Sequence, residues 1–287
     1  MTALFGTRLA NKYGDLSNAL RQAADYLSEH PIDIATRPLR AVSKESGVSP
    51  AAFTRLAHAL DYEGFEELRE EMRAQIGRRM DKFADRAERL QQDHALTRTG
   101  FFDAHLLACQ QNLETLSQTI DRELLDQATD RIAKSRQVLL LGALASTGIV
   151  EYFSYLANFH AENWSLAGRM GASLGGSLTS LSEEDALIII TKPPFAARAI
   201  RAAELARNKG AYVVVITDTH SCPALQNASA GFIVPTDSPH FFSSYVVTLF
   251  LVETLIGMLV SRSGDPARKR ISEVENTSRV LAEVWDQ

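Results

Sequence analysis

Four short runs of branched apolar residues in the second half of the chain constrain its fold most strongly. They are residues 138–141, 186–190, 212–216 and 231–234, and most are separated by stretches long enough for a helix. The runs are continuously apolar and do not alternate with polar residues, as expected for strands covered on both faces. Strands that alternate with helices form a parallel sheet in an α/β domain. We therefore predict a doubly wound parallel sheet in this half.

The first 135 residues have a different character, because they show helical periodicity and no alternation of period two. We predict an all-α region there, which makes the whole chain an all-α domain followed by an α/β domain. The boundaries that we expect are a helix-turn-helix domain over residues 1–80, a helical linker over 81–135, the α/β domain over 136–262 and a C-terminal helix over 263–287.

The composition excludes several classes of protein. Apolar residues make up 45% of the chain and charged residues 23%, as in a globular protein. Two cysteines leave no room for a disulfide framework or a thiolate metal cluster. No secretory signal is visible, and the longest apolar run, residues 246–260, is shorter than the roughly 20 residues of a membrane span. We expect a cytoplasmic protein without membrane partner, cofactor or metal.

Residues 38–60 have the pattern of two helices joined by a tight turn. Gly47 falls where the turn must follow the first helix, since glycine takes a positive φ without steric cost. Ser49 then stands as the N-cap of the second helix, and Pro50 occupies its first position. One face of the second helix is apolar, with side chains spaced i, i+3, i+4 and i+7: Phe53, Leu56, Ala57 and Leu60. This is the pattern of a helix-turn-helix unit.

The opposite face of the second helix has the residues that a DNA-reading helix needs, namely short side chains for close approach and a few polar ones for bases and phosphates. The net charge of −5 does not exclude this function, because a reading helix needs few cations. A small helical hairpin with a solvated face is the alternative interpretation. The predicted DNA-binding residues are Arg40, Lys44, Ser49, Ala51, Thr54, Arg55 and His58.

This region resembles the N-terminal domain of the RpiR-type bacterial transcription regulators. The similarity rests on ADYLSEHP at residues 24–31, on the GVS turn at 47–49, on TRLAHALDYEGFEEL at 54–68, and on their spacing. It extends over about residues 15–75 without an obvious gap. The resemblance implies binding to an operator in double-stranded DNA.

The same family carries a sugar isomerase (SIS) domain, and residues 136–262 resemble one. Gly142 ends the first predicted strand, and the next helix begins near Ser146 and Thr147, where amides and hydroxyls form a cradle for an anion. The SIS pattern here is G-x-G-x-S, and this chain has Leu144 at the second glycine. The alternatives are that Ser146 is only an N-cap and that Gly142 serves only a tight turn.

The second phosphate loop departs further from the SIS pattern S-x-S-G-x-T, which aligns with residues 191–196. Thr191 keeps its hydroxyl, but two prolines remove N–H donors, and Ala196 removes the last hydroxyl. Lys192 adds a cation that either binds the ligand or is a solvated loop lysine. The usual mode of binding phosphosugars is therefore in doubt.

Three further candidate residues lie in or beside the last long apolar run, two just before it and one within it. Ser243 and Ser244 either donate to a ligand or cap the helix. SIS isomerases place a carboxylate base in this helix, but we expect Glu253 to be a buried carboxylate at a subunit contact. Three histidines, His160, His220 and His240, show no metal-binding spacing, and Asp218 is expected to cap a turn.

These features predict a transcription regulator that binds DNA and senses a small metabolite, a sugar phosphate or related anion, as a homodimer or homotetramer. The effector-binding residues that we predict are Gly142, Ser146, Thr147, Thr191, Lys192, Ser243 and Ser244. Two alternatives remain open: a phosphosugar aldose–ketose isomerase, and a SIS domain that serves only for dimerisation.

Overall fold

The computed structural model divides the chain into two compact units. The first comprises residues 1–119 and 235–247, and the second comprises residues 120–234 and 248–287. The residues that the structure describes are 5–80, 83–97, 100–169 and 171–285.

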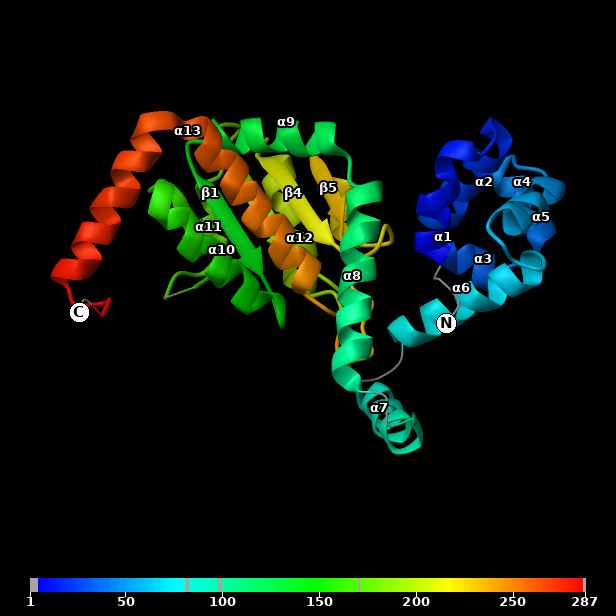
Figure 1. The fold of residues 1–287 in the computed structure, drawn as a ribbon. Helices are drawn as coiled ribbons and strands as arrows, with labels where there is room; N and C mark the ends of the chain where they lie inside the picture. The colour runs from blue at the N-terminus through cyan, green and yellow to red at the C-terminus, as the bar shows by residue number, and fades with distance from the viewer. Residues whose placement is uncertain (1–4, 81–82, 98–99, 170, 286–287) are drawn as a thin grey trace. The chain divides into compact units, whose positions relative to one another are not determined.

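The first unit is helical, as predicted (Figure 1). Its core lies among the first six helices and contains Leu27, Ile34, Phe53 and Leu56, all fully buried. The helices are α1 (Phe5–Lys12), α2 (Asn18–Glu29), α3 (Pro31–Thr36), α4 (Leu39–Ser46), α5 (Pro50–Ala59), α6 (Phe65–Met80), α7 (Phe83–Thr97) and α8 (Phe101–Thr119), with a 3₁₀ turn η1 (Tyr13–Asp15) after α1.

The second unit is a parallel α/β domain, which confirms the predicted doubly wound sheet. Its five strands are ordered β2-β1-β3-β4-β5, and every neighbouring pair is parallel. The elements are α9 (Arg122–Ala133), β1 (Val138–Gly142), α10 (Ser146–His160), β2 (Trp164–Leu166), α11 (Leu174–Thr179), β3 (Ala186–Ile190), α12 (Ala197–Asn208), β4 (Tyr212–Thr217), a 3₁₀ turn η2 (Pro223–Asn227), β5 (Ala230–Ile233) and α13 (Val246–Val280).

Strand β2 is the element that the apolar runs do not predict. It has three residues, too few to show a pattern, and only Trp164 at its start is buried. The indole ring packs against Phe153 of α10, with 5.4 Å between the ring centroids. Packing in the folded domain therefore identifies this strand, and the local sequence does not.

Both faces of the sheet are covered, as the continuous apolar runs require. Leu139, Leu187 and Val213 share one face, where they form a core with the alanines of α12. Strand β1 also contacts α10, and β4 and β5 contact α9. Since right-handed crossovers place α10 and α12 on opposite faces, the strands are buried from both sides.

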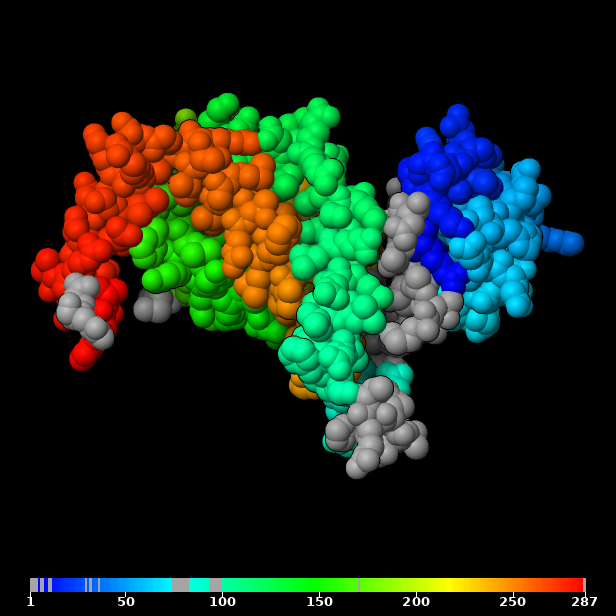
Figure 2. Space-filling view, in the orientation of Figure 1, coloured from blue at the N-terminus to red at the C-terminus, as the bar shows by residue number. Residues whose placement is uncertain are grey.

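Helix α13 contains the longest apolar run and bends at Gly264, whose φ of 59° and ψ of −144° are not helical. By length and composition alone α13 is long enough to cross a membrane, and a third of its most apolar window is buried in the chain. One such helix is weak evidence for a membrane span, because core helices pass the same test. Its buried side chains include Leu251, Leu255 and Leu259. One side of its first half (orange) lies at the surface in Figure 2. The helix ends at Val280, before the predicted end.

Candidate functional sites

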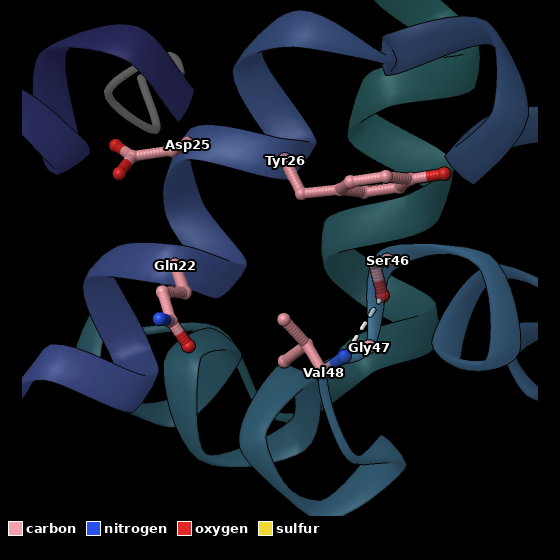
Figure 3. Close-up of a pocket in the computed structure, with 6 residues that line it drawn as sticks. All are labelled: Gln22, Asp25, Tyr26, Ser46, Gly47 and Val48. Carbon is pink, nitrogen blue, oxygen red and sulfur yellow. Dashed lines mark hydrogen bonds between the residues drawn. The ribbon is translucent and has the colours of Figure 1, made fainter.

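The turn between α4 and α5 has the geometry that the sequence predicts. Gly47 ends α4 in the left-handed conformation with a φ of 69°. The Ser46 hydroxyl accepts a hydrogen bond from the Val48 amide at 3.2 Å (Figure 3), and the Ser49 hydroxyl accepts one from the Ala52 amide at 3.3 Å. The Ser49 bond confirms its role as the N-cap of α5.

Helix α5 presents one buried and one exposed face, as its periodicity predicts. Phe53 and Leu56 are fully buried, whereas Ala51, Arg55 and His58 are exposed. The remaining predicted residue of this face is half-buried Thr54, whose hydroxyl donates to the carbonyl of Pro50 at 3.2 Å.

Helix α4 adds two exposed cations to this region, Arg40 and Lys44, which lie one helical turn apart. The Arg55 Nε donates to the carbonyl of Ala51, one turn earlier in α5, at 3.3 Å. Three cations that reach solvent from α4 and α5 are what phosphate contacts require. Their contacts with DNA remain a prediction.

An open hollow of about 430 Å³ lies where the turn packs against α2 (Figure 3). The carboxylate of Asp25 accepts a hydrogen bond from the Tyr13 hydroxyl at 2.8 Å. An acidic lining does not favour a phosphate, so we do not place DNA or an anionic effector here. The lining residues are Gln22, Asp25, Tyr26, Ser46, Gly47 and Val48.

In the second unit, several of the predicted effector-binding residues lie at one edge of the sheet. Gly142 at the end of β1 pairs with Ile190 at the end of β3, so the loops that follow both strands start side by side. The two strands are adjacent at the point where the strand order reverses, and doubly wound domains bind ligands at this point, outside the carboxyl ends of the strands. Ser146 and Thr191 are both buried here, at 1% and 3% exposure.

The loop between β1 and α10 shows why the SIS pattern has a second glycine. Leu144, which replaces it, has a φ of 55°, in the left-handed region that glycine adopts most easily. The amide of Ser146 donates to the carbonyl of Ala143 at 3.1 Å, and that of Thr147 donates to the carbonyl of Leu144 at 3.2 Å. These two amides of the predicted anion cradle are therefore used within the loop.

Two alternative interpretations of this loop are wrong. Ala145 is the N-cap of α10, and Ser146 is the first residue of the helix, so Ser146 is not an N-cap. Gly142 does more than allow a tight turn, since a Cβ atom there would overlap the carbonyl of Ser146 and come within 2.7 Å of the Val150 side chain. Gly142 is therefore required for the close packing of α10 on β1.

The loop that follows β3 contains a buried cation. Lys192 is 6% exposed, so it is not a solvated loop lysine. Its Nζ donates to the hydroxyl of Thr248, at the start of α13, at 2.6 Å. Burial lowers the pKa of Lys192 from 10.5 to about 7, and the negative charge of Asp218 partly opposes this change. The SIS pattern supplies several hydroxyls and backbone amides in this loop. Here the loop keeps the hydroxyl of Thr191 and adds the amine of Lys192, whose charge depends on its surroundings.

Two residues at this edge, Asp218 and Thr248, are not among those predicted to bind the effector. Asp218 directly follows β4 and is 5% exposed, and Thr248 is fully buried. The signal for Asp218 was its position after a strand, because the carboxyl ends of parallel strands share one edge. Thr248 stands as a polar residue within an apolar run, but its partner Lys192 is 56 residues away in the sequence.

The predictions for the segment before α13 have different outcomes. The hydroxyl of Ser244 accepts a hydrogen bond from the amide of Val246, the first residue of α13, which supports its capping role. Ser243 is half-buried. Within the single chain Glu253 is exposed and accepts a hydrogen bond from the Tyr152 hydroxyl of α10 at 2.8 Å, and its burial at a subunit contact stays a prediction. Among the described residues, no three His, Cys, Asp or Glu side chains form a group that could hold a metal ion.

Comparison with known families identifies both halves of the chain. Residues 4–78 match the helix-turn-helix domain of the rpiR family, and residues 131–258 match the SIS domain. The two matches include the α4–α5 turn and the loops at the carboxyl edge of the sheet.

Several solved structures share this fold, including the following two. The NanR protein of Vibrio vulnificus, solved in complex with ManNAc-6P, is 19% identical, and the alignment covers 96% of this chain and 98% of NanR with a TM-score of 0.57. The sugar isomerase domain of an RpiR transcription factor from Sphaerobacter thermophilus is 18% identical, with 60% of this chain and 96% of that domain covered and a TM-score of 0.56.

Proposed function

The chain belongs to the RpiR-type DNA-binding transcription regulators, and we propose that α5 reads its operator and that an anionic sugar derivative bound at the carboxyl edge of the SIS sheet changes this binding. The observation that carries the proposal is the exposed polar face of α5, next to a correctly capped turn. Regulators of this kind bind two half-sites as symmetric dimers, so we propose that the working form is a homodimer or homotetramer. A cytoplasmic location follows from DNA as its partner.

Operator binding is tested by fluorescence anisotropy with the DNA upstream of its own and neighbouring genes, with scrambled competitor and across a salt series. We expect affinity that survives the competitor and falls steeply with salt. Arg55→Ala should weaken operator binding by about 10- to 100-fold, corresponding to the loss of one base contact. The matched control is Arg198→Ala, which removes an exposed arginine from α12. Equal affinity of the wild type for operator and scrambled DNA would contradict the proposal.

The effector site is proposed to include Ser146, Thr147, Thr191 and Lys192. An anionic sugar derivative is supported by the buried cation at this edge and by the ligand ManNAc-6P of NanR, whose fold this chain shares. An effector changes operator affinity only if it binds the DNA-competent and incompetent arrangements with different affinity.

The test for an effector is the operator affinity measured with a panel of sugar phosphates that includes ManNAc-6P. One of them should change the affinity of the wild type. Ser146→Ala should reduce this response, while Ser180→Ala, at an exposed serine, should not. A panel without effect on operator affinity would favour the alternative that the SIS domain serves only for dimerisation.

We propose sensing and not isomerisation as the task of this SIS domain. A general base must be positioned at a proton of the substrate. Glu253, the carboxylate at the position expected for a base, is instead exposed and bound to Tyr152. Turnover of a phosphosugar that disappears in Glu253→Gln would contradict this assignment.

A further inference from the structure

Lys192, Thr248 and Asp218 form a buried polar group, which we call the lysine cluster. Each member comes from a different part of the second unit: the loop after β3, the start of α13 and the loop after β4. Their exposures are 6%, 0% and 5%, and 2.6 Å separates the Lys192 Nζ from the Thr248 Oγ1. Such a group is uncommon in a protein core, because burying an ammonium group costs free energy.

The charges around Lys192 do not fully offset this cost. Asp218 is the carboxylate that acts on it, and Thr248 on α13 contributes only a neutral hydroxyl. Residues 142–146, from the end of β1 to the start of α10, have no ionisable side chain, and His220 beyond Asp218 is exposed. Burial therefore lowers the pKa of Lys192 to about 7, far below the ordinary value of a lysine, and the charge of Asp218 only partly opposes this change.

We propose that the lysine cluster is the part of the effector site that selects an acidic ligand, and that Lys192 takes up a proton from solvent when the acidic group of the effector binds. The inference rests on the proposed function, because it concerns the same effector site. Thr248 and Asp218 are positioning residues that hold the amine at the carboxyl edge until a ligand arrives.

The proton uptake follows from electrostatics. An anion beside Lys192 stabilises its charged form and raises its proton affinity, so the neutral amine gains one proton and becomes an ammonium. By linkage, effector affinity must fall with rising pH above the pKa of the free site, by up to about tenfold per pH unit. An effector with a neutral group in place of the acid would cause no such uptake.

The experiment measures the titration of Lys192 by NMR in the full-length protein with ¹³C-labelled lysine. The Lys192 signal is assigned by its loss in Lys192→Arg. Sulfate serves as the probe anion because it does not titrate near neutral pH, and chloride at equal ionic strength is the control. We expect a midpoint near 7 in chloride that sulfate raises by about one unit or more. A Lys192 midpoint near its ordinary value, or one that sulfate leaves unchanged, would overturn the proposal.

Two variants test the cluster separately. Asp218→Asn should lower the Lys192 midpoint further, because the opposing carboxylate is lost. Lys192→Arg keeps a permanent charge, so its affinity for sulfate should no longer depend on pH between 6.5 and about 8.5. The same affinity–pH curve in wild type and Lys192→Arg would overturn the proposal.

The operator assay keeps the two proposals distinguishable. If a sugar phosphate changes operator affinity equally at pH 6.5 and about 8.5, the regulator stands and the proton uptake is wrong. If the chain binds no operator, the proposed function fails, and the Lys192 titration still decides whether the lysine cluster is a proton-linked anion site.

Discussion

The helix-turn-helix turn and the carboxyl edge of the SIS sheet each contain a glycine, a serine and a cation, but these residues act in different ways. Gly47 is needed for its φ of 69°, and a Cβ atom there would meet nothing within 4 Å. Gly142 is needed for space, because a Cβ atom would collide with α10. Arg55 is exposed, whereas Lys192 is 6% exposed.

The two sites obtain their properties in different ways. The turn is stabilised by hydrogen bonds between residues two or three positions apart, and the cations near it are exposed to solvent. The carboxyl edge is built from loops far apart in the sequence, and its cation is desolvated by packing. A change at the turn should therefore act locally, and a change at the edge should disturb the domain core.

Gly142→Ala is the change with the largest expected effect. The new methyl group must displace α10 from β1, so we expect a loss of about 3 kcal/mol or more in the free energy of unfolding of the SIS domain. Urea unfolding followed by circular dichroism measures it. Gly257→Ala in α13, where a Cβ atom meets nothing within 4 Å, is the control and should be neutral or stabilising. Equal losses in both variants would refute the packing argument.

Lys192→Met tests the difference between the two cations through the pH dependence of stability. Below about pH 7 the native state carries the buried charge, and as pH rises from about 7 towards 10.5 the unfolded state keeps a proton that the native state has lost. Wild-type stability should therefore rise with pH relative to the variant. We expect Lys192→Met to be more stable than wild type by about 1–3 kcal/mol at pH 6, with the advantage shrinking above pH 7.

The control for this measurement is Lys134→Met, which removes an exposed lysine at the end of α9. Its stability should follow that of the wild type across the whole pH range. Curves for Lys192→Met and wild type that stay parallel from pH 6 to about 9 would show that the native state does not shift the pKa of Lys192.

Ser49→Ala tests the local character of the turn. The Ala52 amide loses its hydrogen bond at the start of α5, and we expect a loss of about 1 kcal/mol in unfolding free energy. Ser17→Ala is a matched control, because Ser17 is the N-cap residue of α2 but does not cap it through its side chain. A cost as large for Ser17 as for Ser49 would mean that the capping bond is not the cause.

The smallest expected effect concerns Leu144, the residue that replaces a glycine of the SIS pattern. Leu144→Gly removes the side chain from a residue whose backbone is left-handed, a conformation that glycine adopts without steric cost. It should stabilise the domain by about 0.5–1 kcal/mol. Leu205→Gly, at another exposed position inside α12, should destabilise it by a similar amount. Thermal unfolding of both variants decides the sign, and destabilisation by Leu144→Gly would be the contrary result.

Much of the fold could be predicted because its signals are local. The continuous apolar runs identify four of the five strands, and the spacing of Gly47, Ser49 and Phe53 predicts the turn and the two faces of α5. Each of these signals lies within about one element, where backbone conformation and side-chain periodicity are directly linked. Strand β2 lacks such a signal, since its pairing with β1 depends on the packing of Trp164.

The candidate effector site could be predicted only in part. The motif spacing picks out Gly142, Ser146 and Thr191, which the fold brings to one edge of the sheet. It does not show that Leu144 takes a left-handed φ or that Glu253 is exposed. The environment of Glu253 depends on which helices meet, and residues about 100 positions apart in the sequence leave no local pattern. For Leu144 the only signal was that it replaces a glycine of the SIS pattern.

The two domains, the helix-turn-helix and the family could be predicted from the amino-acid sequence, because periodicity, caps and motif spacing are properties of consecutive residues. The environment of Lys192 depends on the folded domain. Its burial, its bond to Thr248 and the nearby charge of Asp218 result from three segments that meet at the ends of parallel strands. A lysine is a solvated cation by default, and its pKa changes only when folding removes water and brings other charges close.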